Sequence, residues 1–290
     1  MFIKQNKDFR KNNNCNDRIL TNIIAILTDF GPLGGHYVAS MKGTILKINP
    51  NVNIIDITQN ISSYSIIEAS YLIKTTYKHF PEHSVFLVVV DPGVGSSREI
   101  LAFKSDSNYY FIGPNNGVFS TIFSNEKIVE CVIVNNDEYF NKPVSNTFHG
   151  RDIMAPIGAH ITRGVPLSKF GPSFNLDNLT EIDVEYRLIP NERTIHCTVQ
   201  YIDNFGNITT NIPIKDNLIE GSSLSLKDTI ELESKNQKYR GKFATHFATE
   251  SLHSLLFLVG STGYLEISMN QGNAAKDLLL KVGDIITVRI

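Results

Sequence analysis

Residues 84–98 read SVFLVVVDPGVGSSR, and this stretch decides the class of fold. Six consecutive apolar residues end at an aspartate, which Pro-Gly follows at once. A short, continuous apolar run of this kind is typical of a strand buried on both faces of a parallel sheet. Asp91 therefore stands at the carboxyl end of a buried strand, at the start of a loop that leads to Arg98.

The segments before this strand alternate between strand and helix patterns. Strands are predicted at 22–30 and 53–58, and helices at 37–48 and 65–80. The order strand, helix, strand, helix, strand predicts an α/β domain with a doubly wound, mostly parallel sheet. Ligands of such domains bind at the carboxyl ends of the strands. Asp29 and Asp91 both fall at such ends, so we expect them to share one site.

The pattern changes in the second half of the chain. A helix after Asp152 should end at Gly164, and short alternating segments without helices follow from about residue 194. Seven strands are predicted, at 194–203, 208–212, 222–227, 229–233, 255–260, 264–269 and 285–290. They indicate a small antiparallel β-barrel or β-sandwich. The expected organisation is a flexible N-terminal extension (1–21), a ligand-binding α/β domain (22–175), a linker (176–190) and a C-terminal β-barrel domain (191–290).

Composition excludes several classes of protein. The 27 basic and 29 acidic residues give a net charge of −2, without the basic excess of a nucleic-acid-binding protein. The three cysteines, Cys15, Cys131 and Cys197, are widely spaced, so neither a disulfide framework nor a zinc site is expected. No apolar run approaches the ~20 residues of a membrane span. No signal peptide is recognisable, and a cytoplasmic location is expected.

The G-x-G in DPGVGSSR admits three interpretations. A dinucleotide-binding fingerprint needs a third glycine and a helix directly afterwards, whereas residues 99–105 form a strand pattern. A hairpin with Asp91 capping its turn is the simpler structural alternative. In a functional interpretation, the glycines let the loop turn closely past a ligand.

Two further motifs of the first domain carry polar side chains. In TDFG (28–31), Asp29 suits two hydrogen bonds from a ribose diol, or else a helix cap. In FHGRD (148–152), His149 precedes a helix and is a candidate catalytic group, although a lone histidine is often structural. For Arg151 and Asp152 we favour a structural pair or a helix cap.

The barrel sequence contributes the remaining candidates. In DNFGN (203–207), Asn207 has the amide that matches a donor and an acceptor on an adenine edge, and Phe205 can stack on a base. A plain hairpin is the alternative. Residues 260–275, GSTGYLEISMNQGNAA, combine small residues with an aromatic one and suit the wall of a cleft.

These motifs, together with GPNNG (113–117), follow one another across residues 28–275 in an order that resembles the S-adenosyl-L-methionine (SAM) hydroxide adenosyltransferases. These adenosine-forming SAM hydrolases are related to the SAM-dependent fluorinase and chlorinase. The resemblance implies an N-terminal α/β domain that binds SAM and a C-terminal β-barrel. It also implies a homotrimer whose sites lie between neighbouring subunits.

The resemblance also implies roles for individual residues. Asp91, Arg98 and His149 would direct water onto the 5′-carbon of SAM and release adenosine and L-methionine. SAM is then a substrate rather than a cofactor, and no metal is needed. By the same matching, Asp29 would hold the ribose hydroxyls and Asn207 the adenine. Residues at the methionine and adenine end would be Ser261, Tyr264 and Glu266.

Two alternatives remain at this stage. The first is a SAM-dependent halogenase, although the halogenating relatives have a small polar residue or glycine where this chain has His149, and lack the DPGVGSSR arrangement. The second is a SAM- or adenosine-binding protein without turnover, which Asp29 and Asn207 would satisfy equally well. Intact Asp91, Arg98 and His149 favour hydrolysis over both.

Overall fold

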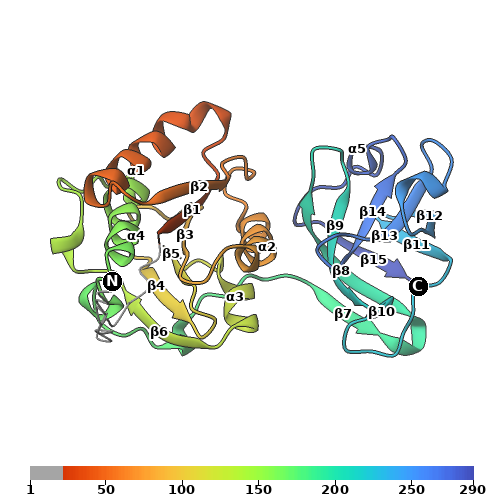
Figure 1. Cartoon of the computed structure of the whole chain (residues 1–290). Coiled ribbons are helices and arrows are strands. Elements are labelled where there is room, and N and C mark those ends of the chain that lie inside the picture. Colours follow the sequence, from red (N-terminus) through yellow and green to blue (C-terminus); the bar gives the residue numbers. More distant parts are fainter. Residues whose placement is uncertain (1–21) are drawn as a thin grey trace, which may run out of the picture.

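The computed structural model describes residues 22–290, which form two lobes joined by one extended segment (Figure 1). The predicted N-terminal extension, with Cys15, lies outside the described residues. Within 22–290, no helix combines the length and the apolar character that a membrane crossing requires.

The first lobe is built on a six-stranded sheet in the order β2-β1-β3-β5-β4-β6. The strands are β1 (Ile23–Thr28), β2 (Asn53–Thr58), β3 (Val85–Val89), β4 (Ile100–Ser105), β5 (Tyr110–Pro114) and β6 (Ile128–Ile133). Strand β4 runs antiparallel to both of its neighbours, and the pairs among β2, β1, β3 and β5 are parallel. The predicted, mostly parallel sheet is confirmed.

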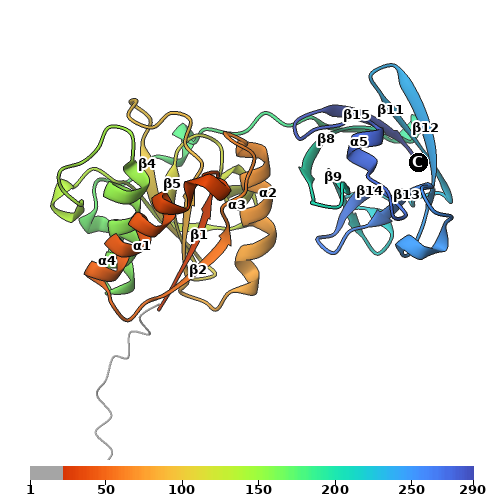
Figure 2. The ribbon, with the colours of Figure 1, turned by 90° about the horizontal axis from the view of Figure 1, so that it is seen from above.

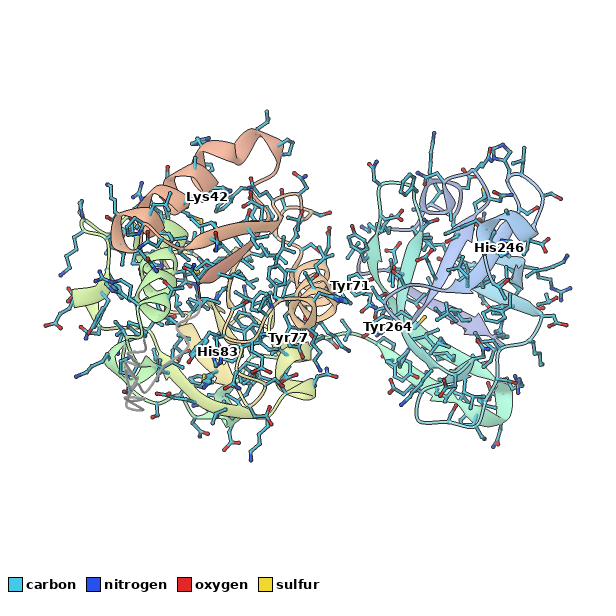
Figure 3. All side chains as sticks on the ribbon, in the orientation of Figure 1. Lys42, Tyr71, Tyr77, His83, His246 and Tyr264 are labelled. Carbon is cyan, nitrogen blue, oxygen red and sulfur yellow. The ribbon has the colours of Figure 1, made fainter. Side chains whose placement is uncertain are left out.

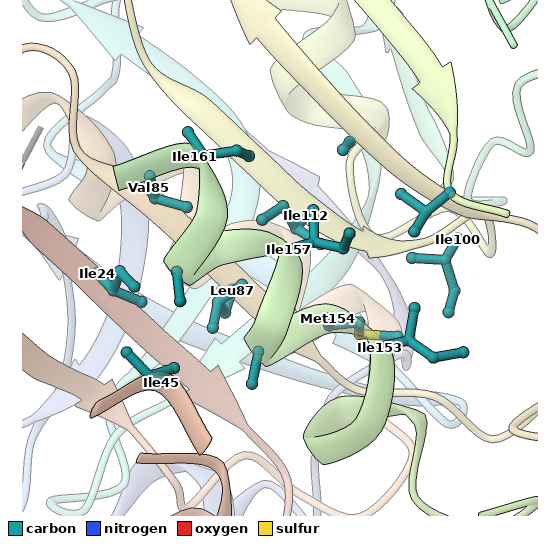
Figure 4. Close-up of a cluster of buried hydrophobic side chains, with 14 of the residues drawn as sticks. Ile24, Ile45, Val85, Leu87, Ile100, Ile112, Ile153, Met154, Ile157 and Ile161 are labelled. Atoms are coloured by element: carbon teal, nitrogen blue, oxygen red, sulfur yellow. The ribbon is translucent and has the colours of Figure 1, made fainter. Parts of the chain in front are cut away.

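Helices cover both faces of this sheet, as the doubly wound prediction requires (Figure 2). They are α1 (Gly35–Ile48), α2 (Ile66–Thr76), α3 (Ser120–Asn125) and α4 (Ala155–Thr162). Alternate residues of β1 point to opposite faces: Ile24 and Ile26 pack with α1 and α4, whereas Ala25 and Leu27 pack with α2 and α3. Figure 4 shows the first of these two cores, in which Ile157 and Ile161 of α4 lie over Val85 and Leu87.

The second lobe is a closed barrel of seven strands in the order β9-β14-β13-β12-β11-β15-β8, with β8 pairing back to β9. Strands β7 and β10 extend it at the sides. The bounds are β7 (Tyr186–Ile189), β8 (Thr194–Ile202), β9 (Ile208–Lys215), β10 (Leu218–Ile219), β11 (Thr229–Ser234), β12 (Gln237–Phe243), β13 (Leu255–Val259), β14 (Tyr264–Met269) and β15 (Ile285–Arg289), with a short helix α5 (Ala274–Asp277). The predicted barrel is therefore confirmed, with one parallel pair, β12 and β13, in an otherwise antiparallel arrangement.

Three details differ from the sequence interpretation. The strand predicted at 222–227 is absent, and this segment makes only an isolated bridge between Ser225 and Leu218. Strand β12 has a polar sequence, QKYRGKF, that carries little strand pattern, and its pairing with β11 and β13 supplies its stability. Strand β7 lies within the expected linker and pairs with β8, while the domain boundaries themselves stay predictions.

Helix α2 of the first lobe packs against the barrel. The ring of Tyr71 stacks on that of Tyr201 with centroids 5.3 Å apart, and its hydroxyl lies 3.0 Å from that of Thr262. One turn further, Nζ of Lys74 donates to the hydroxyl of Tyr264 at 2.6 Å. Figure 3 shows Tyr71 and Tyr264 facing each other between the lobes.

Candidate active site

Asp91 and Arg98 form a buried ion pair at the carboxyl end of β3. Nε of Arg98 donates to both carboxylate oxygens of Asp91, each at 2.9 Å, and Nη2 donates to Oδ2. Only 6% of the Asp91 side chain and 11% of the Arg98 side chain are exposed. The acid at the strand end is therefore paired, as an uncompensated charge at this depth would be strongly destabilising.

His149 completes the cluster from another loop. Its Nδ1 lies 2.9 Å from Nη2 of Arg98. Because a guanidinium only donates, Nδ1 must accept this hydrogen bond, and the neutral ring then carries its hydrogen on Nε2. The structure thus brings Asp91, Arg98 and His149 together, with Arg98 between the other two.

Gly95 explains how the two loops come so close. It has a positive φ of 80°, and a Cβ there would lie 2.4 Å from the carbonyl oxygen of Asn146. The loop after β3 therefore packs directly on the backbone that leads to His149. We expected the glycines to give clearance for a ligand, but at Gly95 the clearance is for the protein backbone itself.

Asp152 fixes the loop that carries His149. Its fully buried carboxylate accepts hydrogen bonds from Nδ2 of Asn141 at 2.8 Å and from the backbone N–H of Ser145 at 2.9 Å. Nε and Nη2 of Arg151 donate to it at 2.7 Å. The favoured pairing of Arg151 with Asp152 is confirmed, and His149 directly precedes the π-helical turn Gly150–Met154 that leads into α4.

The electrostatic environment keeps His149 neutral. Burial lowers the pKa of His149 below its ordinary value, and the nearby charge of Arg98 lowers it further, against smaller opposing effects of Asp91 and Asp152. An uncharged imidazole with its Nε2 hydrogen available is thus the stable form at neutral pH.

Asp29, Asp91 and His149 line one cavity of about 220 Å³. Its walls also include the rings of Phe30 and Phe148, which meet edge to face at 5.9 Å. Oδ2 of Asp29 accepts the backbone N–H of Tyr64 at 2.8 Å. Asp29 and Asp91 therefore line the same cavity, and their roles in binding and catalysis stay predictions.

The candidate residues of the barrel do not line the cavity that contains Asp29. Every residue that lines the Asp29 cavity belongs to the first lobe. Ser261 and Tyr264 instead line a separate cavity of about 630 Å³ between α2 and the barrel. Phe205 is 74% exposed at the tip of its loop, next to Asn207. Their roles in binding stay predictions.

Glu266 lies on β14 and accepts a hydrogen bond from the Ser268 hydroxyl at 2.8 Å. Burial raises the pKa of Glu266, and Asp203 adds to this increase. Its role in binding also stays a prediction.

The sequence interpretation overlooked two groups that position candidate residues. Asp152 was assigned to a structural pair or a helix cap, although it also organises the His149 loop. Asp203 was not singled out, yet its carboxylate accepts three hydrogen bonds from the loop that carries Phe205 and Asn207. An Asp two residues before Phe205 in a Gly- and Asn-rich turn is the signal that would have found it.

No group of three or more His, Cys, Asp or Glu side chains within residues 22–290 is arranged to hold a metal ion. The cluster of Asp91, Arg98 and His149 is instead suited to hold a polar nucleophile. Arg98 contributes a fixed positive charge, and His149 contributes a hydrogen-bond donor.

An α/β lobe with a carboxylate, a guanidinium and an imidazole clustered near its strand ends, followed by a seven-stranded barrel, defines a two-lobed α/β and β-barrel protein with a candidate active site in the first lobe. Comparison with known families identifies it further. Residues 24–171 match the SAM hydroxide adenosyltransferase N-terminal domain, and residues 197–287 match the C-terminal domain of the same family. The chain belongs to the SAM hydroxide adenosyltransferase family.

Individual relatives agree with this assignment. The chain is 34% identical to the (R)-S-adenosyl-L-methionine hydrolase of Methanocaldococcus jannaschii, over 93% of this chain and 96% of the relative. It is 26% identical to a fluorinase of Nocardia brasiliensis, over 92% and 97% of the two chains. A crystal structure of an uncharacterized conserved protein from Thermotoga maritima superposes with a TM-score of 0.83 at 35% identity and covers 92% of this chain and all of that one.

Proposed function

We propose that the protein hydrolyses SAM to adenosine and L-methionine. The observation that carries this proposal is the cluster in which the guanidinium of Arg98 bridges Asp91 and His149, two residues that line one cavity with Asp29. The relatives named as SAM hydrolases support it, and the family membership supports the choice of substrate.

In the proposed reaction, the oxygen of a water molecule attacks the 5′-carbon of SAM in line with the carbon–sulfur bond. That bond breaks with its electron pair going to the sulfonium sulfur, which leaves as the neutral thioether of methionine. The leaving group therefore needs no proton. The water must lose one proton, so catalysis depends on activating the nucleophile.

We assign distinct tasks to the three residues. His149 donates from Nε2 to the attacking oxygen and holds it in line, and the charge of Arg98 favours developing hydroxide. Asp91 orients the guanidinium of Arg98 and balances its charge, and the proton that the attacking water loses passes to bulk water. Asp29 accepts hydrogen bonds from the ribose hydroxyls and fixes the 5′-carbon above this cluster.

The decisive experiment is incubation of the purified protein with SAM in halide-free, chloride and fluoride buffers made with ¹⁸O-labelled water, followed by chromatography and mass spectrometry. Hydrolysis predicts adenosine with ¹⁸O on its 5′-carbon in every buffer. Formation of a 5′-halo-adenosine only in the halide buffers would establish the halogenase alternative. The similarity to fluorinases is the reason to test it. Binding of SAM without any product would establish the binding-protein alternative.

We further propose a homotrimer in which the barrel of one subunit covers the cavity of its neighbour. The separation of Asn207 and Phe205 from the Asp29 cavity within one chain supports this arrangement. Mixing the impaired variants His149→Ala and Asn207→Ala should raise the activity above that of either variant alone, because mixed trimers then contain intact composite sites. Activity that does not recover on mixing would place each site within one subunit, and light scattering measures the number of subunits.

We also propose a cytoplasmic location. Cys131 and Cys197, the cysteines within the described range, are both buried and unpaired, which suits a reducing compartment. Fractionation of cells that produce the protein would test this location.

A further inference from the structure

The carboxylate of Asp203 holds the loop that carries Phe205 and Asn207. Its Oδ1 accepts the backbone N–H of Phe205 and that of Asn207, both at 2.9 Å. Its Oδ2 accepts Nδ2 of the Asn207 side chain, also at 2.9 Å. One carboxylate thus fixes both the backbone of the loop and the side-chain amide of Asn207.

The backbone of this loop is fixed from other directions as well. The N–H of Asp203 donates to the carbonyl of Asn207 at 3.1 Å, and the N–H of Gly206 donates to the carbonyl of Asp203 at 3.0 Å. Gly206 has a positive φ of 85°, and a Cβ there would lie 2.2 Å from the side chain of Asn273. The freedom that remains for Asn207 is therefore mainly the rotation of its amide.

The carboxylate of Asp203 also fixes the rotation of the Asn207 amide. A carboxylate only accepts hydrogen bonds, so Nδ2 of Asn207 must be the atom that faces it. The amide then presents Oδ1 and the second Nδ2 hydrogen away from the loop. Every buried side-chain nitrogen or oxygen within residues 22–290 has a partner, and Oδ1 of Asn207 has none there, so solvent reaches it.

We propose that Asp203 determines the specificity for the base by locking the amide of Asn207 in the orientation that matches adenine. The inference rests on the proposed function, in which Asn207 binds the adenine of SAM. Oδ1 can accept from the exocyclic amino group, and the free Nδ2 hydrogen can donate to an adjacent ring nitrogen. Hypoxanthine has a carbonyl oxygen in place of that amino group and would meet Oδ1 acceptor to acceptor.

The variant Asp203→Asn tests this idea with little change in shape. Its Oδ1 has to stay toward the two backbone N–H groups, because the alternative orientation would leave both unpaired. Its Nδ2 then replaces Oδ2 and faces the Asn207 amide as a donor. Asn207 should turn over to accept it and so present the inverted pattern of donor and acceptor.

The experiment measures kcat/KM for SAM and for its deaminated analogue, which carries hypoxanthine, with the wild-type protein and three variants. We expect the wild type to prefer SAM by roughly 5- to 150-fold, the range of one good paired contact to a base. Asp203→Asn should lower this preference about tenfold or more. Asn207→Ala should abolish it, and Asp216→Asn, an equal charge change in the exposed turn after β9, should leave it unchanged.

The possible failures are separable. A wild-type protein that does not hydrolyse SAM refutes the proposed function itself. Hydrolysis with an unchanged preference in Asp203→Asn, together with a lost preference in Asn207→Ala, refutes the locking role of Asp203 alone. Equal losses for both substrates in Asp203→Asn would reduce Asp203 to a structural residue and overturn the inference.

Discussion

Nη2 of Arg98 lies 2.9 Å from Nδ1 of His149, while Nε of the same guanidinium lies 2.9 Å from both oxygens of Asp91. The acid and the imidazole therefore meet through Arg98 rather than directly. A change at any of the three positions disturbs the other two, so we expect their effects on turnover to be far from additive.

Replacement of His149 by alanine removes the Nε2 donor that we assign to the nucleophile. We expect kcat to fall by about 10²- to 10⁴-fold, because the oxygen is no longer oriented, while KM changes little. Adenosine production under saturating and limiting SAM measures both constants. Circular dichroism serves as the folding control, and an unchanged kcat would remove His149 from the mechanism.

Replacement of Asp91 by asparagine keeps the shape of the side chain and removes its charge. The guanidinium of Arg98, 11% exposed, then loses its counter-charge, and the free energy of unfolding should fall by about 3–5 kcal/mol, as for other broken buried pairs. Denaturant unfolding measures this loss.

Asp137→Asn is the matched control for that variant. It breaks the exposed pair with Lys142 and should cost less than about 1 kcal/mol. Equal losses in the two variants would contradict a special role of the buried pair.

The activity should depend on pH through His149. Burial and the charge of Arg98 lower the pKa of this imidazole below its ordinary value of 6.5, so the ring is neutral at pH 7. Protonation places a second donor against Nη2 of Arg98 and breaks their contact. We therefore expect kcat/KM to be constant around neutrality and to fall on the acid side, with a midpoint below 6.5.

The variant His149→Asn provides the control for this profile. Its amide oxygen can still accept from Arg98, and it has no group that titrates in this range, so its residual activity should lack the acid limb. A wild-type midpoint at or above 6.5 would contradict the lowered pKa of His149.

The sequence predicted the α/β lobe well because its strands and helices have strong local patterns. Residues 85–90 are buried on both faces of the sheet, as their continuous apolar run predicts. Strand β12 was missed because its sequence is polar, and the strand predicted at 222–227 did not form despite its alternating residues. In both cases, pairing with neighbouring strands decides the outcome, and a local pattern does not contain that information.

For the candidate site, the sequence supplied the residue types and the strand ends but not the connections between them. Asp91 and Asp29 were placed together because parallel strands end at one edge of the sheet. The contact between Arg98 and His149 joins residues 51 positions apart and depends on the loop packing at Gly95. The orientation of Asn207 by Asp203 depends on hydrogen-bond geometry that sequence spacing cannot specify.

Replacement of Gly95 by alanine should separate the two loops of the cluster. The added Cβ would lie 2.4 Å from the carbonyl oxygen of Asn146, and the positive φ is unfavourable for alanine. We expect at least about a tenfold loss of kcat, together with a destabilisation of about 1 kcal/mol or more. Gly43→Ala on α1, where a Cβ meets no atom within 4 Å, is the matched control and should leave turnover unchanged.

The contact of Lys74 with Tyr264 predicts that the hydroxyl of Tyr264 holds α2 on the barrel rather than binding substrate. If this hydroxyl serves the docking of α2 on the barrel, Lys74→Met and Tyr264→Phe should lower the free energy of unfolding by similar amounts. The double variant should then reveal a coupling of about 1–2 kcal/mol, because each single change removes the same charge-assisted hydrogen bond.

A hydroxyl that binds substrate predicts a different result for the same pair of variants. Tyr264→Phe would then raise KM for SAM, whereas Lys74→Met, which leaves the hydroxyl in place, would not. The 2.6 Å contact with Lys74 favours docking, so we expect the KM of both variants to stay within about twofold of the wild type. A KM that rises in Tyr264→Phe alone would instead assign Tyr264 to substrate binding, as the family resemblance implies.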